Sequence, residues 1–370
     1  LNGGKTMMGG ILTATNRKIE ADHLNFMHDQ AYTGGINFKH RWSDRTYQFA
    51  FRGIASHVRG SERAITRTQK SSARYYQRPD VSHVSMDTNR NSLSGHGGSL
   101  MFTKLGQGHF NYGLFFNWKS PGLELNDMGY QREADQVSQL AFAQYRRWEP
   151  FMIFRNLRVN FNQWRIWDYG GNHLFTGGNI NMNMQFKNYW ELGFGINASS
   201  PELSRTALRG GPFLKEPASY RYWAEIESDQ RKKLKFSIGS NQSWEAHHNS
   251  QRTSIFTDIT YIPHNTLNLS ISPSVSFRKN ELQYVDTRNY NDQKRYIMAS
   301  IDRTTLSMSL RVNFSLTPDL SLQYWGQPFI ATGNYSDFKR ITNSTAENYK
   351  DRFHTFTDQQ ITRQNGHFKI

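Results

Sequence analysis

The sequence contains no cysteine and no apolar stretch long enough for a membrane-spanning helix. Without cysteine, thiolate metal sites and cysteine nucleophiles are excluded. A spanning helix takes about 18 consecutive apolar residues, so none is expected. The sequence also lacks the G-x-S-x-G, H-E-x-x-H and phosphate-binding-loop patterns. The absence of long apolar runs does not exclude a barrel that crosses a membrane with strands, because such strands turn only every second side chain toward lipid.

Aromatic residues and positive charge are what the 370-residue chain has in excess. Aromatics make up 14% of it, and its formal net charge is +15. The aromatic content is typical of girdles at two membrane interfaces, although a large soluble sandwich or propeller is an alternative. The charge would suit nucleic acid, but no nucleic-acid motif accompanies it, so no such partner is predicted. It equally suits a lumen and loops that face lipopolysaccharide or an acidic solute.

Alternation of apolar and polar residues is the clearest structural signal. In residues 266–277 one face carries Leu267, Leu269, Ile271, Val275 and Phe277, and the other carries serine and asparagine. The same period of two recurs in 306–316, 179–186 and 233–238. A soluble sandwich alternates too. The runs reach about 9 to 13 residues, however, which is the length a tilted membrane strand needs.

Short and long connections alternate along the chain, as they do between the two ends of an outer-membrane barrel. Tight turns are predicted at Ser43-Asp44, Leu105–Gly108, Glu149-Pro150, Lys187-Asn188, Gln230-Arg231, Pro263–Asn265 and Thr317–Asp319. Long polar loops are predicted at 59–95, 119–137, 168–173, 199–218, 243–250 and 279–294. The glycines Gly95 to Gly98 fit a close approach of backbones better than a phosphate cradle.

The predicted fold is therefore all-β: a transmembrane, antiparallel, up-and-down barrel of the outer-membrane type. We expect about fifteen or more strands in one domain over residues 1–370, incomplete at both ends. The chain starts at Leu1 with no leader pattern, so either a signal peptide has been removed or this is an internal fragment. The polar tail after Gln327 is expected to be a loop that leads into absent strands.

Two long loops, 59–95 and 119–137, hold the candidate ligand-binding residues and are expected to fold over or into the lumen. These candidates are Arg67, Arg74, Tyr75, Tyr76, Arg78, Glu124, Asn126 and Asp127. The basic and aromatic members could present a face to an anionic or sugar ligand. Alternatively, the arginines pair with carboxylates and hold the loops in place.

The oxygen-rich loop 119–137 allows two further readings. Its carboxylates and amides could bind Ca²⁺, although EF-hand spacing is absent, so no metal or other cofactor is predicted beyond that weak signal. Glu124 and Asp127 could also be a glycosidase pair, but sequence spacing does not give the separation that this mechanism requires. His247-His248 has no third candidate ligand nearby and is expected to be solvated.

Aromatic residues near the predicted strand ends have two interpretations. Girdles at the membrane interfaces are the structural one. Sugar stacking in the lumen is the functional alternative. The residues concerned are Trp148, Phe151, Trp164, Trp167, Tyr189, Trp190, Tyr220, Tyr222, Trp223, Tyr324 and Trp325.

Several segments together resemble one family. They are Ala31–Gly35, Ile65–Gln69, Tyr75–Asp80, Ser92–Gly98, Ser120–Tyr130, Arg209–Pro212, Ile301–Ser307 and Gln327–Phe329. In order and spacing they are similar to the domain of unknown function 5916. The resemblance implies a larger parent in Bacteroidota, with a signal peptide, an N-terminal sandwich similar to carbohydrate-binding family 9, and a C-terminal outer-membrane barrel. The family has no established activity.

The sequence thus predicts a non-enzymatic protein of the bacterial outer membrane, acting as a channel, in transport or in surface assembly. Its expected partners are outer-membrane lipid and lipopolysaccharide, an anionic or sugar ligand, and other outer-membrane or secretion proteins. A plugged scaffold that anchors the carbohydrate-binding-like domain or a secretion partner is the first alternative. A membrane-associated hydrolase that acts on polysaccharide is the second, with no catalytic residue assigned.

Overall fold

The structure, a computed structural model, describes residues 1–246, 250–357, 362–364 and 367–369. Strands make up most of it. Helical segments in these ranges are the α-helix α1 (Glu62–Lys70) and the 3₁₀ turns η1 (Asn2–Gly4), η2 (Asp22–Leu24) and η3 (Tyr349–Arg352). The all-β prediction is confirmed. No helix in the described part of the chain has both the length and the apolar character needed to cross a membrane.

The chain forms two compact units, each described here by itself. Unit 1 comprises residues 1–145, 161–178 and 201–216, and unit 2 comprises 146–160, 179–200 and 217–370. Strands β7 (Phe154–Trp167) and β8 (His173–Phe186) contribute residues to both units. The prediction of a single barrel domain stays a prediction.

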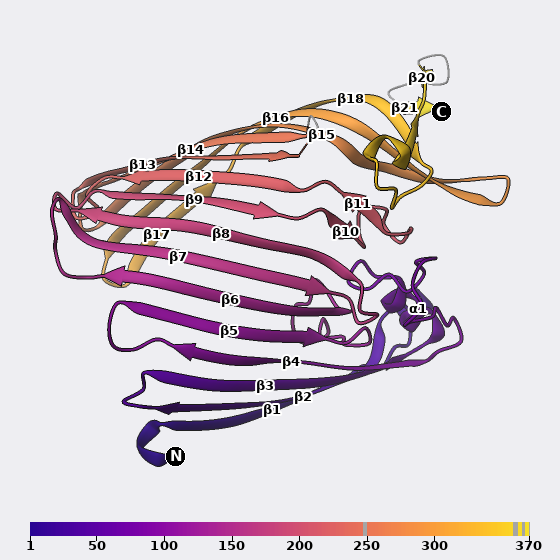
Figure 1. The fold of residues 1–370 in the computed structure, drawn as a ribbon, viewed down its shortest axis with the longest axis horizontal. Helices are drawn as coiled ribbons and strands as arrows, with labels where there is room; N and C mark the ends of the chain where they lie inside the picture. Colours follow the sequence, from indigo (N-terminus) through magenta and orange to yellow (C-terminus); the bar gives the residue numbers. More distant parts are fainter. Residues whose placement is uncertain (247–249, 358–361, 365–366, 370) are drawn as a thin grey trace. The chain divides into compact units, whose positions relative to one another are not determined.

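Unit 1 is built from consecutive antiparallel strands (Figure 1). These are β1 (Thr6–Asn16), β2 (His28–Trp42), β3 (Tyr47–Gly60), β4 (Ser92–Lys104), β5 (Phe110–Lys119) and β6 (Gln136–Arg147). A short separate hairpin joins β10 (Glu202–Ser204) to β11 (Leu214–Glu216). Each main strand pairs with the next in the sequence, which is the up-and-down order that the alternating connections predict.

Unit 2 continues the same antiparallel pattern. Its strands are β9 (Glu191–Ser199), β12 (Ser219–Glu227), β13 (Leu234–Glu245), β14 (Gln251–His264), β15 (Leu267–Tyr290), β16 (Gln293–Thr317), β17 (Leu320–Gly326), β18 (Phe329–Ile341), β19 (Phe353–Thr355), β20 (Thr362–Gln364) and β21 (His367–Lys369). β9 pairs with β12, and β12 to β16 then pair in sequence order. β16 pairs with both β17 and β18. The antiparallel prediction is confirmed within each unit.

The prediction of a long loop at 279–294 was wrong. These residues form the far ends of β15 and β16, which pair as far as Tyr290 and Gln293. Asn291 and Asp292 make the turn between them, with φ angles of 48° and 56°. Asparagine and aspartate tolerate positive φ, and two such residues close a hairpin whose twist matches its strands. The polar composition of this segment concealed the pairing.

The expectation for the tail after Gln327 was also wrong. Residues Phe329–Ile341 form β18, which pairs with the Ile297–Ser307 part of β16. β17 pairs with the other end of β16, between Leu310 and Thr317. β16 is 25 residues long, so it has room for both partners. The weak alternation of β18 did not reveal it as a strand.

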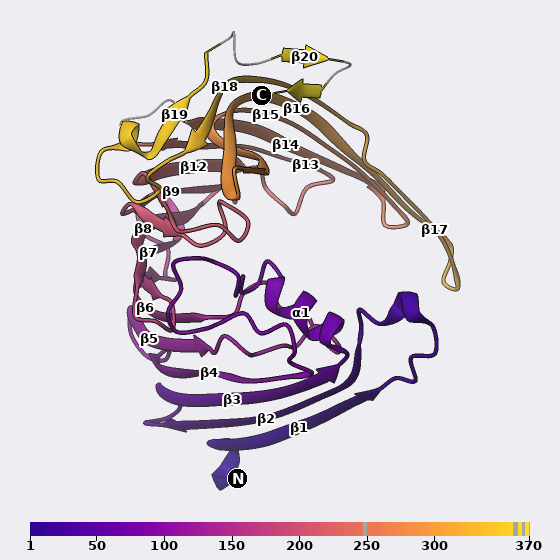
Figure 2. The ribbon, with the colours of Figure 1, turned by 90° about the vertical axis from the view of Figure 1, so that its right-hand side faces the viewer.

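A small core under α1 fixes the long loops to unit 1. Ile65 of α1 is fully buried in a cluster with Ala31 of β2, Val58 of β3 and Leu93 of β4. Figure 2 shows α1 lying on one side of these strands. Ser61 caps the helix, because its Oγ accepts from the Ala64 N–H at 3.2 Å. The residues between β3 and β4 are therefore a packed element.

The apolar side of the alternating strands has no covering layer in the described part of either unit. In unit 2, exposed fractions are 48% for Ile238, 49% for Phe277 and 54% for Leu306. In unit 1, Leu114 is 57% exposed and Phe116 is 42% exposed. Contiguous uncovered apolar surface of this kind marks a membrane or an interaction partner.

Gly95 confirms the predicted close approach of backbones. A Cβ atom built on Gly95 of β4 would overlap the backbone at Gly122 and Leu123. Only glycine lets this loop lie flat on the strand.

We expect Gly95→Ala to lift residues 119–135 from β4 and to destabilise that packing by about 1–3 kcal/mol. Hydrogen exchange of residues 119–135 would rise. Gly10→Ala in β1 is the matched control, because its nearest neighbour, the Gly35 carbonyl oxygen, lies at an ordinary 3.4 Å. Equal exchange in the two variants would show that the loop does not rest on this glycine.

Candidate functional site

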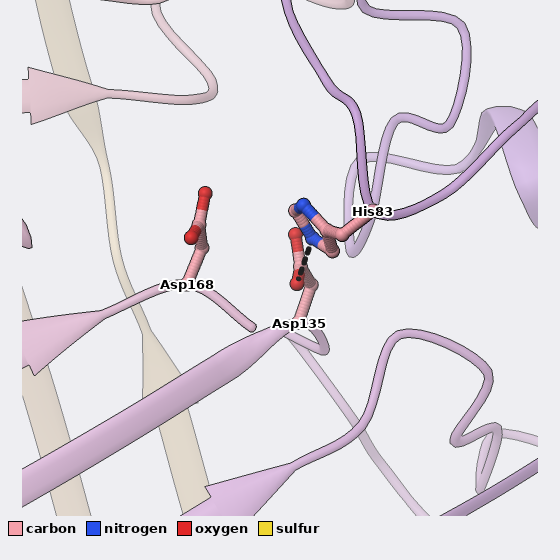
Figure 3. Close-up of side chains that lie close together, drawn as sticks. All are labelled: His83, Asp135 and Asp168. Atoms are coloured by element: carbon pink, nitrogen blue, oxygen red, sulfur yellow. Dashed lines mark hydrogen bonds and ion pairs between the residues drawn. The ribbon is translucent and has the colours of Figure 1, made fainter. Parts of the chain in front are cut away.

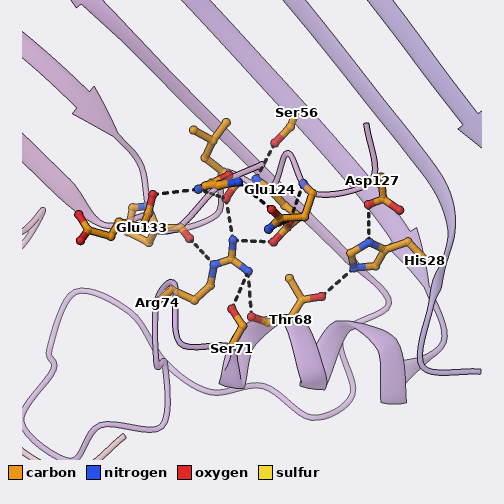
Figure 4. A network of polar contacts seen from close by, with 12 residues as sticks. His28, Ser56, Thr68, Ser71, Arg74, Glu124, Asp127 and Glu133 are labelled. Atoms are coloured by element: carbon orange, nitrogen blue, oxygen red, sulfur yellow. Dashed lines mark hydrogen bonds and ion pairs between the residues drawn. The ribbon is translucent and has the colours of Figure 1, made fainter. Parts of the chain in front are cut away.

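A buried ion pair lies at the centre of the folded loops of unit 1 (Figure 4). Arg74 follows α1, and its Nη2 lies 2.8 Å from Oε2 of Glu124 in the loop between β5 and β6. The two residues are 3% and 5% exposed. Arg74 also donates to the carbonyl oxygens of Thr68, Pro121 and Leu123 at 2.7–3.1 Å. One guanidinium thus joins the helix C-terminus to the second loop.

Glu124 has its remaining acceptor capacity filled from its own loop. Its Oε1 accepts from the backbone N–H of Asn126 at 2.9 Å and from the Asn126 Nδ2 at 2.7 Å. The backbone N–H of Glu124 donates to Ser56 Oγ at 3.0 Å. Glu124 and Asn126 therefore shape the loop. A buried carboxylate paired in this way does not reach solvent, where a glycosidic oxygen would need its proton.

Asp127 belongs to a second polar cluster, which also contacts α1 at Thr68. Its carboxylate accepts from Arg17 Nη1 at 2.6 Å, and its Oδ2 lies 2.7 Å from His28 Nδ1. The Nε2 of the same ring lies 2.7 Å from Thr68 Oγ1. Burial raises the pKa of Asp127, but the hydrogen bonds from His28 and Arg17 outweigh it and bring the pKa below its ordinary value. Asp127 thus ties β2 and the chain after β1 to α1.

The remaining predicted ligand-binding residues also have partners within the loops. Arg67 lies over the Phe26 ring at 4.4 Å, and Arg78 lies over the Phe213 ring at 4.7 Å. Tyr76 is 6% exposed within the core under α1, and burial raises its pKa. Tyr75 has a positive φ of 45° at the bend after the helix. Their role in binding a ligand stays a prediction.

The structure brings together one group with metal-ligand chemistry that the sequence did not indicate (Figure 3). Ligand atoms of His83, Asp135 and Asp168 all lie within 4.8 Å of one another. His83 Nε2 is 2.7 Å from Asp135 Oδ1. Asp168 accepts from the backbone N–H and the Nδ2 of Asn172, each at 2.9 Å. The three residues come from separate loops, so no local spacing could have revealed them.

The surroundings of this group do not suit a cation. Arg205 Nη1 and Arg78 Nη2 lie 3.5 and 3.6 Å from Oδ2 of Asp135. A divalent ion bound to Asp135 would therefore lie beside two guanidinium groups. Burial and then Arg205 lower the pKa of Arg78, while Asp135 opposes them. We assign the group to loop packing. Of the oxygen-bearing residues in the loop 119–137, Glu124 and Asn126 lie in the cluster around Arg74, Asp127 lies beside His28, and Asp135 lies beside His83.

The polar face of unit 2 contains side chains that sequence reasoning did not single out. One hollow of about 510 Å³ is lined by Glu225, Glu227 and Asp258 together with strand serines. Another of about 430 Å³ is lined by polar residues that include Arg221 and Arg252. Charged residues at alternate positions of β12 and β14 were a usable signal, but only strand register shows which of them are neighbours. His247-His248 lies outside the described residues.

The chain belongs to the family described as domain of unknown function DUF5916, which it matches over residues 55–368. The resemblance inferred from the sequence motifs is therefore confirmed at the level of the family. Comparison with curated proteins gives no match.

Two solved structures are among those similar to this chain. The ferric enterobactin receptor PfeA of Pseudomonas aeruginosa, a mutant in complex with enterobactin, has 7% identity and a TM-score of 0.37, over 91% of this chain and 71% of that one. OccAB4 of Acinetobacter baumannii has 9% identity and a TM-score of 0.34, over 90% of this chain and 97% of that one. Similarity at this level says nothing of function.

We expect Glu124→Gln to loosen both long loops by about 3–5 kcal/mol, because it leaves the buried guanidinium of Arg74 without its counter-charge. Hydrogen exchange of the segments 61–91 and 120–135 would rise together. Glu133→Gln is the control in the same loop, since the side chain of Glu133 is exposed and its one described hydrogen bond is with Gln136. Unchanged exchange after Glu124→Gln would show that this carboxylate is not what holds the loops.

Proposed function

We propose that this chain is the membrane-embedded β-barrel part of a bacterial outer-membrane protein and acts as a passive conduit for hydrophilic solutes. One observation carries the proposal: the strands have an uncovered apolar face and a polar opposite face. Leu306 and Phe277 lie on the first face, and Ser307, Ser276 and their neighbours lie on the second. Acyl chains would solvate the first face and water the second.

Strand length and backbone pairing support a membrane location. Strands β1 to β9, β12 to β16 and β18 each have nine residues or more, whereas β17 has seven. A tilted strand crosses a bilayer with about 9–11 residues. In the proposed barrel every backbone group in the hydrocarbon layer is paired with a neighbouring strand, as closure requires. Lipopolysaccharide would contact the outer rim, and the net charge of +15 on the chain as a whole favours anionic groups.

A plugged scaffold is the second candidate, and the loop cluster of unit 1 favours it. α1 and the residues around Arg74 pack on one face of β2, β3 and β4 through a buried core and buried polar contacts. An element held this firmly would narrow a lumen permanently. The barrel would then anchor another domain or a secretion partner. Glu124 and Asp127, the carboxylates considered for the hydrolase alternative, both take part in loop contacts, which favours the two other candidates.

Reconstitution of the purified chain into a planar bilayer tests the conduit. In a potassium chloride gradient we expect stable conductance with a reversal potential biased toward chloride, because the chain carries a net charge of +15. A preparation that inserts and stays silent would reject the conduit in favour of the plugged scaffold. A folded preparation that never enters the bilayer would reject the membrane location itself.

A further inference from the structure

Four arginines form one row across neighbouring strands of unit 2. Strand register places Arg221 of β12 opposite Ser243, Ser243 opposite Arg252, Arg252 opposite Arg278, and Arg278 opposite Arg303. Residues directly opposite one another point to the same side of a sheet. The row therefore runs across β12, β13, β14, β15 and β16 on the polar face. With strands about 4.8 Å apart it spans roughly 19 Å.

The row has few counter-charges. Among the described residues no carboxylate lies within ion-pairing distance of these four arginines, and Arg252 donates only to hydroxyl groups, at 3.2 Å to Ser254 and Ser276. The negative charge of Glu245 acts on Arg278 from a distance, but the carboxylate of Glu245 is itself hydrogen bonded to Ser250. Like charges placed directly opposite each other destabilise a sheet. Three adjacent arginines in register are therefore a cost that an anionic ligand would offset.

The next row provides hydroxyl, amide and indole groups. This row lies two residues along each strand from the arginine row, and it consists of Trp223, Asn241, Ser254, Ser276 and Thr305. The indole of Trp223 packs over β9, since a Cβ on Gly193 or Gly195 would meet its ring. Hydroxyl and amide groups exchange hydrogen bonds with the hydroxyls of a sugar, and an indole offers a flat apolar surface for its ring.

An acidic band limits where an anion can lie. Glu225 is four residues from Arg221 on the same face of β12, or about 13 Å along the strand. Glu227 is opposite Ser237, which is opposite Asp258, so the band continues across β13 and β14. Negative charge there repels an anion that shifts along the strands and favours one that lies across them, on the arginine row.

We infer that the arginine row of unit 2 binds a linear acidic oligosaccharide, with its carboxylates on Arg221, Arg252, Arg278 and Arg303 and its hydroxyls on the neighbouring polar row. This inference rests on the proposed function and names the solute class of the same polar face. Guanidinium groups hold carboxylates through two parallel hydrogen bonds, which gives orientation as well as attraction. The hydroxyl-rich row and Trp223 favour a sugar chain over polyphosphate or single-stranded nucleic acid.

Calorimetric titration of the full chain in detergent tests the site. The probe is a short oligogalacturonate, and the comparators are a neutral malto-oligosaccharide and an oligothymidylate of matching charge. We expect binding of the acidic sugar that weakens with salt, and no binding of the neutral one. Absence of acidic-sugar binding would overturn the inference. Equal or tighter binding of the oligothymidylate through the same arginines would overturn the sugar assignment.

A matched pair of variants distinguishes binding at the arginine row from a general effect of positive charge on the polar face. Arg278→Gln/Arg303→Gln should weaken binding about tenfold or more. Lys235→Gln/Arg311→Gln removes the same charge from the same polar face, four rows away along the strands, and should weaken it less than about threefold. Arg278→Lys/Arg303→Lys should give an intermediate loss of affinity for the acidic sugar. Such a result would also show that the fold tolerates substitution at both positions. Equal losses in the first two variants would overturn the site.

The binding experiment and the conductance experiment test the arginine row and the conduit separately. A chain that binds the acidic sugar through the row but stays silent in bilayers would overturn the conduit and support the site. A chain that conducts without such binding would overturn the site and support the conduit.

Discussion

Water and acyl chains cannot solvate the same side of a strand, and the account of this protein depends on that constraint. In unit 2 one side of β15 and β16 carries leucine, isoleucine, valine and phenylalanine without a covering layer, while the other carries serine, threonine and arginine. In water the exposed apolar side would be costly at about 25 cal/mol for each Å². In a bilayer the same side is at its most stable, and the polar side must then face a hydrated interior.

The long loops of unit 1 are held by a different interaction, a buried pair of charged side chains. Arg74 and Glu124 are removed from water, and each then needs every hydrogen bond it can make. The carbonyl groups around the guanidinium and the amide groups around the carboxylate supply these bonds. A buried pair of this kind specifies one loop arrangement, since any shift leaves an unpaired charge. The loops therefore have a defined place over β2, β3 and β4.

Sequence alone predicted what depends on local pattern. The alternation in 266–277 and 306–316 and most of the tight turns follow from nearest neighbours along the chain, and they are present in the structure. Two turns are displaced: Pro263 and His264 belong to β14, and the turn predicted at Glu149-Pro150 lies at 152–153. The glycine-rich composition also predicted the close approach at Gly95. The segment 279–294 and the tail were mistaken because polar strands carry little periodic signal. The partners of Arg74 and Asp127, the group around Asp135 and the arginine row depend on contacts between distant residues. Those contacts require the register, which a single sequence does not provide.

Depth-dependent quenching tests the central claim most directly. A fluorophore attached at single introduced cysteines at Leu306, Ser307, Leu310 and Ser309, in vesicles of brominated lipid, reports which side of β16 meets acyl chains. Since the chain has no cysteine of its own, each label is unique. The account predicts strong quenching at Leu306 and Leu310 and weak quenching at Ser307 and Ser309. Equal quenching on both sides, or none at the leucines, would contradict it.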